Sequence, residues 1–152
     1  MAKITKLNKE GLDLIKQFEG LKLTAYLCSA NVPTIGYGTI RYRNGEKVKL
    51  GDTCTIEQAE TYLKNDVAQF ELAVDAMATD LLNQNQFNAL VSFAYNLGAG
   101  ALKSSTLLKT VNANPTNKAI KGEFSKWINA GGRPVKGLVI RREKEANHYF
   151  GE

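Results

Sequence analysis

Residues 55–77 read TIEQAETYLKNDVAQFELAVDAM, and this stretch predicts one long helix. Thr55 and Gln58 have the spacing of a capping box, in which the side chain of each residue accepts from the backbone N–H of the other. Apolar residues then recur at helical spacing with no Gly or Pro among them: Ile56, Ala59, Leu63, Val67, Phe70, Val74 and Met77. A helix of about 22 residues is about 33 Å long, which is long enough to link two lobes.

The chain before this helix predicts a short helix and then a small antiparallel sheet. Asn8 is a suitable helix cap, and Gly20 is a typical helix stop. Three β-leaning segments follow, at about 23–27, 34–43 and 47–50. Asn44-Gly45 between the last two is a strong signal for a tight turn.

The chain after residue 80 predicts helices only. Gly and Pro divide it into four helical segments, at about 85–97, 101–111, 116–128 and 138–149. We therefore expect a mostly helical α+β fold, in which a small antiparallel β-sheet lobe and a helical C-terminal lobe are joined by a long helix. The expected organisation is a single domain over residues 1–152, with lobes at about 12–54 and 79–152 and a linking helix at 55–78.

Composition favours a globular protein made in the cytoplasm. The chain has 152 residues, of which 43% are hydrophobic, and no apolar run is long enough for a membrane span or a signal peptide. The net charge of +5 is unevenly spread, because nine Lys/Arg residues lie in residues 1–50, one in 51–100 and ten in 101–152. Basic ends suit an anionic polymer, although on charge alone ordinary solvation of exposed faces is the preferred account.

Several kinds of chemistry lack the residues they need. His148 is the only histidine and no elbow-type serine motif accompanies it, so we expect a solvated surface histidine. Cys28 and Cys54 are too few for a disulfide framework, and with one histidine they form no metal-ligand cluster. Reduced thiols are the default expectation, and we expect neither a metal nor another cofactor.

Acid chemistry remains, and Glu19 is its candidate. It follows Phe18 and precedes Gly20-Leu21, and a carboxyl group that lies against apolar surface holds its proton, as a general acid requires. Taken alone, a glutamate at a helix end is more often a solvated residue.

The spacing of Glu19 to Cys28 and Thr34, with eight and then five intervening residues, resembles the catalytic signature of phage-type lysozymes, the endolysins of glycoside hydrolase family 24. The middle position of that signature is usually Asp and sometimes Cys. Further segments resemble the family in the same order along the chain: residues 18–26, 86–98, Trp127, Gly131-Gly132 and 137–143.

The resemblance implies hydrolysis of the β-1,4 bond between N-acetylmuramic acid and N-acetylglucosamine in bacterial peptidoglycan, without a cofactor. It implies that Glu19 donates a proton to the leaving oxygen and that Thr34 positions the attacking water. Tyr37, Tyr95 and Asn96 match positions that line the cleft, although packing and capping roles explain them nearly as well. The resemblance also implies a monomer that stays in the host cytoplasm until a holin permeabilises the inner membrane.

Cys28 and Thr39 stand where the family usually carries another residue. Cys28 has three possible roles: an activated thiolate that acts as base or nucleophile, a neutral thiol that shapes the water site, or a passive small residue. An unperturbed thiol, with a pKa of about 8.5, is mostly neutral at pH 7, so the first role needs a lowered pKa. Thr39 stands where many relatives carry His, which affects local hydrogen bonding.

Arg141, Arg142 and Glu143 are candidates for an ion-pair network, and a charged helix face is the simpler account.

Two other classes of function compete with the enzyme. A nucleic-acid-binding module is disfavoured because no recognisable binding signature accompanies the basic ends. A non-catalytic cationic protein that binds the cell wall or a membrane through residues 136–144 is the main alternative.

Overall fold

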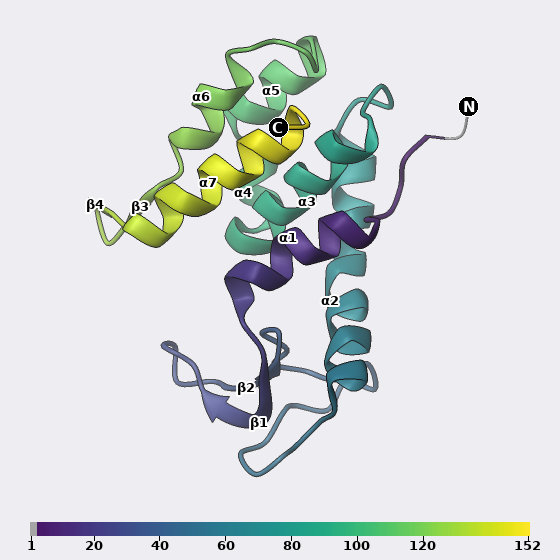
Figure 1. The fold of residues 1–152 in the computed structure, drawn as a ribbon, viewed down its shortest axis with the longest axis vertical. Helices are drawn as coiled ribbons and strands as arrows, with labels where there is room; N and C mark the ends of the chain where they lie inside the picture. The colour runs from purple at the N-terminus through teal and green to yellow at the C-terminus, as the bar shows by residue number, and fades with distance from the viewer. Residues whose placement is uncertain (1–2) are drawn as a thin grey trace. The chain divides into compact units, whose positions relative to one another are not determined.

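The computed structural model describes residues 3–152, and most of them are helical (Figure 1). The elements in chain order are α1 (Lys9–Glu19), β1 (Lys22–Leu27), β2 (Pro33–Gly36), α2 (Ile56–Met77), α3 (Gln84–Leu97), α4 (Ala99–Lys103), α5 (Thr106–Ala113), α6 (Ile120–Ser125), β3 (Asn129–Ala130), β4 (Arg133–Pro134) and α7 (Lys136–Tyr149). The predicted class, mostly helical α+β with small antiparallel sheets, is confirmed. The chain forms two compact units, residues 15–69 and residues 3–14 with 70–152.

The long helix α2 forms where the sequence predicts it, with 22 residues. Its capping box is complete, because the Thr55 backbone N–H donates to Gln58 Oε1 at 2.9 Å and the Gln58 N–H donates to Thr55 Oγ1 at 3.1 Å. Of its predicted apolar row, Leu63 and Val67 are at most 2% exposed, whereas Ile56 is 49% exposed. Local capping and periodicity are therefore sufficient to define this helix.

The sheet in the 15–69 unit is smaller than the sequence predicts. β1 and β2 pair antiparallel, with Tyr26 opposite Thr34, but β2 ends at Gly36. Gly36 and Gly38 have φ angles of 66° and 101°, which turn the chain out of the strand, so the expected strands over 34–43 and 47–50 are wrong in extent. The predicted turn at Asn44-Gly45 is confirmed by the Gly45 N–H, which donates to Tyr42 O at 2.9 Å.

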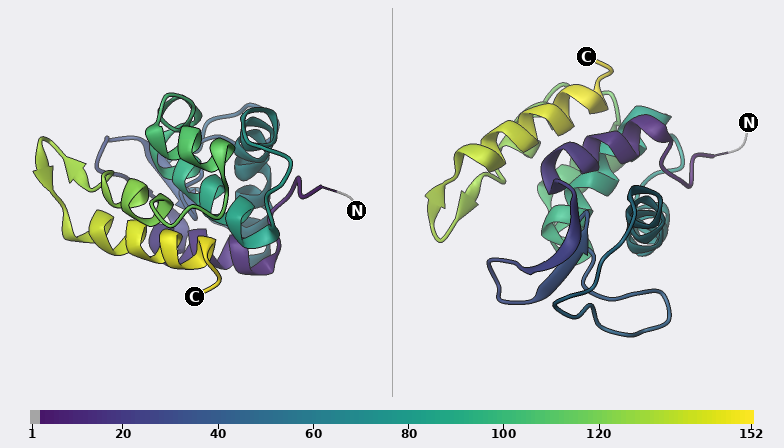
Figure 2. Two further views of the ribbon diagram at one scale, coloured as in Figure 1. Left: turned by 90° about the horizontal axis from the view of Figure 1, so that it is seen from above. Right: turned by 60° about the horizontal axis from the view of Figure 1, so that its bottom comes forward.

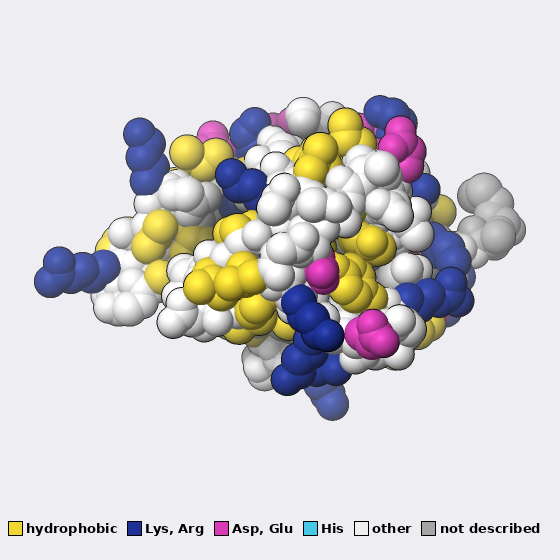
Figure 3. Space-filling model, turned by 90° about the horizontal axis from the view of Figure 1, so that it is seen from below, with side chains coloured by type: hydrophobic (Ala, Val, Ile, Leu, Met, Phe, Trp, Pro, Cys, Tyr) yellow, Lys and Arg dark blue, Asp and Glu magenta, His cyan; other side chains and the backbone are white. Residues whose placement is uncertain are grey.

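A small hydrophobic core holds the 15–69 unit together. Ala25, Ile35 and Val48 form its centre, and the partly buried side chains of Tyr42, Cys54 and Tyr62 pack against it. Other apolar side chains of this unit are 41–57% exposed: Leu23, Leu27, Ile40, Leu50 and Ile56. Figure 3 shows groups of exposed hydrophobic side chains on the face seen from below, with Lys and Arg side chains projecting around them.

In the other unit, α7 lies alongside both α3 and α6 (Figures 1 and 2). Phe93 on α3 contacts Phe124 and Trp127 edge-on, at ring-centroid distances of 5.9 and 5.4 Å. These ring contacts connect α3 to α6 and to the segment that follows it. Within residues 3–152, no helix is both long enough and apolar enough to cross a membrane.

The predicted helical segments in this unit differ from the structure in three places. The segment at 101–111 is split into α4 and α5, because Ser105 caps a new helix by accepting from the Leu108 N–H. The segment at 116–128 is reduced to α6. Residues 129–134 form the β3–β4 hairpin around Gly131-Gly132, which the sequence suggests only as a helix end.

His148 is not the solvated surface residue that the sequence predicts. Its Nε2 lies 3.1 Å from Asn88 Nδ2, and Asn88 is fully buried. Asn8 Oδ1 accepts both from the Gly11 N–H and from Asn88 Nδ2, at 3.0 and 2.8 Å. Since a backbone N–H can only donate, Asn88 Nδ2 must be the donor to both neighbours, so His148 Nε2 accepts and the ring is neutral.

Gly11 makes this cluster possible. A Cβ added to it would lie 2.5 Å from Asn88 Oδ1, which is closer than two such atoms can approach. The helix-cap residue, the buried amide and the histidine therefore meet because position 11 carries no side chain.

Candidate active site

Glu19 is the last residue of α1 and is half-buried. The helix stops here because Gly20 has a φ of +69°, a left-handed conformation that favours glycine. The Gly20 N–H donates to Lys16 O at 3.1 Å and closes the last turn. The chain then enters β1 at Lys22, so Glu19 is fixed at the junction of helix and sheet within the 15–69 unit.

The β1–β2 turn brings Cys28 and Thr34 together. Leu27 pairs with Pro33 across the ladder, and the turn is closed by the Cys28 N–H, which donates to Val32 O at 3.1 Å. Thr34 is 3% exposed, and its hydroxyl donates to Val32 O at 2.8 Å. Two residues with five others between them in the chain thus lie on either side of one turn.

The same turn activates the Cys28 thiol. The backbone N–H groups of Val32 and Ala30, followed by the Thr34 hydroxyl, lower the pKa of Cys28 because they stabilise the thiolate. Thr34 has one hydroxyl proton, which in this structure is donated to Val32 O. A thiolate at Cys28 competes for that proton, so the hydroxyl can serve either acceptor by rotation. The turn therefore combines an ionisable thiol with a movable donor.

Tyr37 lies close to the junction of α1 and the sheet. Its side chain is 8% exposed, and the Lys16 ammonium lies 5.4 Å from the centre of its ring. Lys16 also forms an ion pair with Glu60 at 2.5 Å. These contacts hold the ring in a fixed position, which accounts for Tyr37 structurally, and a substrate contact stays a prediction.

Thr39 is buried and forms a hydrogen bond with the long helix α2. Its hydroxyl donates to Asp66 Oδ2 at 2.7 Å, and Thr39 itself is 1% exposed. Burial raises the pKa of Asp66, whereas the Thr39 hydroxyl acts in the opposite direction. Thr39 therefore links the loop after β2 to the long helix α2.

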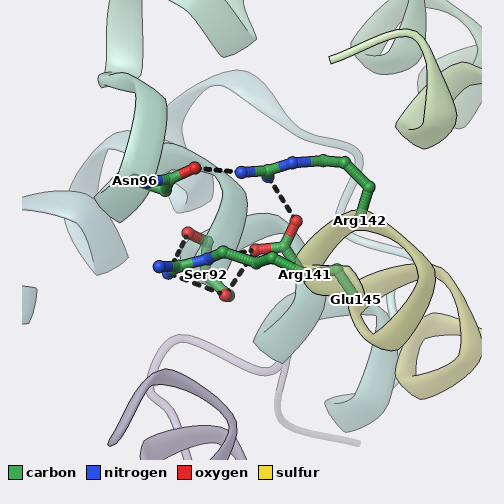
Figure 4. A network of polar contacts seen from close by, with 5 residues as sticks. All are labelled: Ser92, Asn96, Arg141, Arg142 and Glu145. Atoms are coloured by element: carbon green, nitrogen blue, oxygen red, sulfur yellow. Dashed lines mark hydrogen bonds and ion pairs between the residues drawn. The ribbon is translucent and has the colours of Figure 1, made fainter. Parts of the chain in front are cut away.

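Tyr95 and Asn96 belong to the other unit, and the structure gives each of them packing or hydrogen-bond partners there. The Tyr95 ring contacts Phe70 edge-on at 5.5 Å between centroids. Asn96 Oδ1 accepts a hydrogen bond from Arg142 Nη2 (Figure 4). A cleft-lining role for both residues stays a prediction.

The arginines of α7 form a buried network with Glu145, not with the predicted Glu143 (Figure 4). Glu145 is 0% exposed; it accepts from Arg142 Nη1 at 2.5 Å, from Arg141 Nε at 3.2 Å and from the Ser92 hydroxyl at 2.5 Å. Burial raises the pKa of Glu145 and lowers that of Arg142, while their mutual attraction opposes each shift. Glu143 is exposed.

The sequence contains a signal for this partner. Glu145 lies three and four residues after the two arginines, which is the spacing of neighbours on a helix face. Glu143 lies only one and two residues away, and side chains at that spacing point in different directions. The buried Ser92 carries no comparable signal, because only the packing of α3 against α7 brings it to Glu145.

Chemically, the 15–69 unit offers a carboxyl group, a thiol of lowered pKa and a hydroxyl. A carboxyl can donate a proton, a thiolate can accept one, and a hydroxyl can orient a water molecule. No group of three or more His, Cys, Asp and Glu residues in the described part of the chain could hold a metal ion.

The comparisons with known proteins agree over nearly the whole chain. The model of the phage lysozyme family matches residues 16–145. The endolysin of Salmonella phage P22 is 35% identical over 93% of this chain and 96% of its own length. A solved structure, the endolysin from Escherichia coli O157:H7 phage FAHEc1, superposes with a TM-score of 0.87 at 44% identity, covering 95% of this chain and 92% of the other.

Some relatives are longer. The endolysin of Bacillus phage B103 is 47% identical over 91% of this chain, but the match covers 52% of its own length. The chain thus spans about half the length of that relative. Because the family match extends over 130 residues that include Glu19, Cys28 and Thr34, this chain belongs to the phage lysozyme family.

Proposed function

We propose that this protein is a muramidase of the endolysin type, which hydrolyses the β-1,4 bond between N-acetylmuramic acid and N-acetylglucosamine in bacterial peptidoglycan. The observation that carries the proposal is the family match over residues 16–145, which includes the acid at the end of α1 and the Cys28–Thr34 turn. The single lysozyme-type domain that we expect over residues 1–152 is part of this proposal.

In the proposed reaction, Glu19 is the general acid. Its carboxyl proton passes to the glycosidic oxygen as the bond from that oxygen to the anomeric carbon breaks. A water molecule attacks the anomeric carbon, and the new bond replaces the one that is lost. Glycosidases that invert configuration use one group as acid and a second group as base for this water.

We propose Cys28 as that second group, with Thr34 as the residue that positions the water. The thiolate accepts a proton from the attacking water and becomes a thiol, and solvent restores both groups after product release. The lowered pKa of Cys28 supports this role, because it increases the fraction of thiolate at neutral pH. The buried Thr34 hydroxyl lies in the same turn.

We also propose that Tyr37, Tyr95 and Asn96 contact the glycan, and that the protein acts as a monomer after a holin opens the inner membrane. The relatives that carry the name endolysin support action at the cell wall. Light scattering on the purified protein tests the monomer. Lysis of cells that express this chain with and without a holin gene tests the route of release, and lysis without the holin would contradict it.

The decisive experiment replaces Glu19 with Gln, which keeps the size and removes the transferable proton. We expect clearing of chloroform-treated Gram-negative cells to fall by a factor of about 10²–10⁴, the usual contribution of general acid catalysis. Glu10→Gln is the matched control, because Glu10 is an exposed residue of the same helix.

Mass analysis of the digested wall identifies the bond. A reducing muramic acid end is the expected product, and an anhydro end would indicate a transglycosylase instead. Equal clearing by the parent protein and Glu19→Gln would favour the non-catalytic cationic binder.

A further inference from the structure

The 15–69 unit has a recess between the loop at residues 41–43 and α2. It encloses about 310 Å³, which is the lower end of the size range of small-molecule sites. One wall is the loop residues Arg41, Tyr42 and Arg43, and the other is a face of α2 with Tyr62, Asn65, Asp66 and Gln69. We call it the arginine–tyrosine pocket.

Hydrogen bonds and a ring contact hold the walls of this pocket in place. The Tyr42 hydroxyl donates to Asp52 Oδ2 at 2.7 Å, and the Tyr42 ring lies 5.3 Å from the Tyr62 ring. Arg41 Nη1 donates to Gly45 O at 2.8 Å, which anchors the loop wall. A pocket whose walls are fixed in advance loses less entropy when a ligand binds.

The lining groups suit a ligand that carries negative charge on a short flexible chain. Arg41 and Arg43 give the pocket two guanidinium groups against one carboxyl group, that of Asp66, and Asn65 and Gln69 add amides on the helix wall. The acid on this wall, Asp66, accepts a hydrogen bond from the Thr39 hydroxyl, and burial raises its pKa. Guanidinium forks bind carboxylates through paired hydrogen bonds. The rings of Tyr42 and Tyr62 offer apolar surface for the part of the ligand that connects its carboxylates.

Backbone pairing connects this pocket to the proposed catalytic turn. Asp66 in the pocket is bonded to Thr39. Thr39 pairs with Ile35 through two backbone hydrogen bonds of 2.9 Å each, and Ile35 follows Thr34 directly. The pocket and the proposed water-positioning residue therefore share one short stretch of backbone within the same unit.

We propose that the arginine–tyrosine pocket binds the acidic stem peptide of peptidoglycan, the short peptide with free carboxylates that is attached to the muramic acid. The inference rests on the proposed function, since it assumes that this chain acts on peptidoglycan. Charge complementarity and the connection to Thr34 favour a peptide that belongs to the same polymer over an unrelated anion.

The test separates peptide binding from catalysis. The Glu19→Gln protein, labelled with ¹⁵N, is titrated with a synthetic stem tetrapeptide and, separately, with the same peptide whose carboxylates are amidated. We expect saturable shifts of the side-chain amides of Asn65 and Gln69 with the acidic peptide, and binding at least about tenfold weaker with the amidated one, because charge-assisted hydrogen bonds are lost.

Variants of Arg43 locate the site. Arg43 is exposed, so its replacement leaves the core intact. Arg43→Ala should weaken binding of the acidic peptide about tenfold, Arg43→Lys should weaken it less because the charge stays, and Arg133→Ala, an exposed arginine of the other unit, should leave it unchanged.

The enzyme with Glu19 intact supplies a second readout. Arg43→Ala should lower the rate on intact walls and leave the rate on amidase-treated glycan strands, which lack stem peptides, at the parent value. Equal loss on both substrates would overturn the proposal, as would equal binding of the amidated peptide or matching shifts with N-acetylglucosamine oligomers. Peptide binding by a protein that hydrolyses neither substrate would support this inference and refute the proposed function.

Discussion

Replacement of Glu145 by Gln tests whether the buried network of α7 stabilises the helical unit. The change keeps the shape of the side chain and removes its charge. In the parent, the carboxylate is fully buried and accepts from Arg141, Arg142 and Ser92. In the variant, two buried guanidinium groups lose the negative charge of Glu145, and the amide nitrogen of Gln cannot accept from either.

The expected loss of unfolding free energy is about 3–5 kcal/mol, the usual cost of removing one partner of a buried ion pair. A domain has a total stability of about 5–15 kcal/mol, so the loss is a large fraction of the whole. For a chain of this size, each kcal/mol lowers Tm by about 2–4 °C, so we expect Tm to fall by about 6–20 °C.

Urea unfolding followed by circular dichroism measures this loss, with Glu143→Gln as the matched control. Glu143 lies on the same helix but is exposed, so its replacement should change stability by no more than about 0.5 kcal/mol. A Glu145→Gln protein that unfolds within 1 kcal/mol of the parent, roughly the median effect of any substitution, would refute the reasoning. The network would then be a consequence of packing and not a source of stability.

Two further predictions concern ionisable groups. Cys28→Asp should retain wall lysis in a turbidity assay, because a carboxylate replaces the proposed thiolate, whereas Cys28→Ala should reduce it. The rate of the parent should also rise with pH through the lowered pKa of the thiol. Undiminished activity of Cys28→Ala would show that no ionisable group is needed there. Burial lowers the pKa of His148 in the folded protein. The stability that the neutral ring contributes should therefore be complete above the pKa of the unfolded state, about 6.5, and should be lost as the pH falls through the lower pKa of the folded state. Urea midpoints at several pH values should show this fall in the parent and not in His148→Gln, and parallel curves for both proteins would contradict it.

The short-range features of this chain were predictable because their causes are local. The capping box at Thr55, the turn at Asn44-Gly45 and the stop at Gly20 each depend on residues within four positions of one another. Strand extent was not predictable in the same way, because the β-leaning residues after Gly36 have no continuous partner strand and form only single bridges, at Ile35–Thr39 and Arg41–Lys47.

The candidate site divides along the same line. The spacing of Glu19, Cys28 and Thr34 is a property of the sequence, and its resemblance to phage lysozymes agrees with the family match. The lowered pKa of Cys28 is not a property of the sequence alone, because it depends on backbone N–H groups that point at the sulfur only after the turn has formed. The pocket between residues 41–43 and α2 likewise needs the loop to fold back on the helix.

The sequence by itself determined the long helix, the mostly helical class and the position of the acid at a helix end, because periodicity, capping and glycine act over a few residues. Only the tertiary structure decided that Glu145 and not Glu143 neutralises the arginines, and that His148 is held neutral by Asn88. Burial and hydrogen-bond partners depend on which distant segments meet, and Ser92 and Arg141, or Asn8 and His148, become neighbours only when α3 packs against α7 and the N-terminal residues join them.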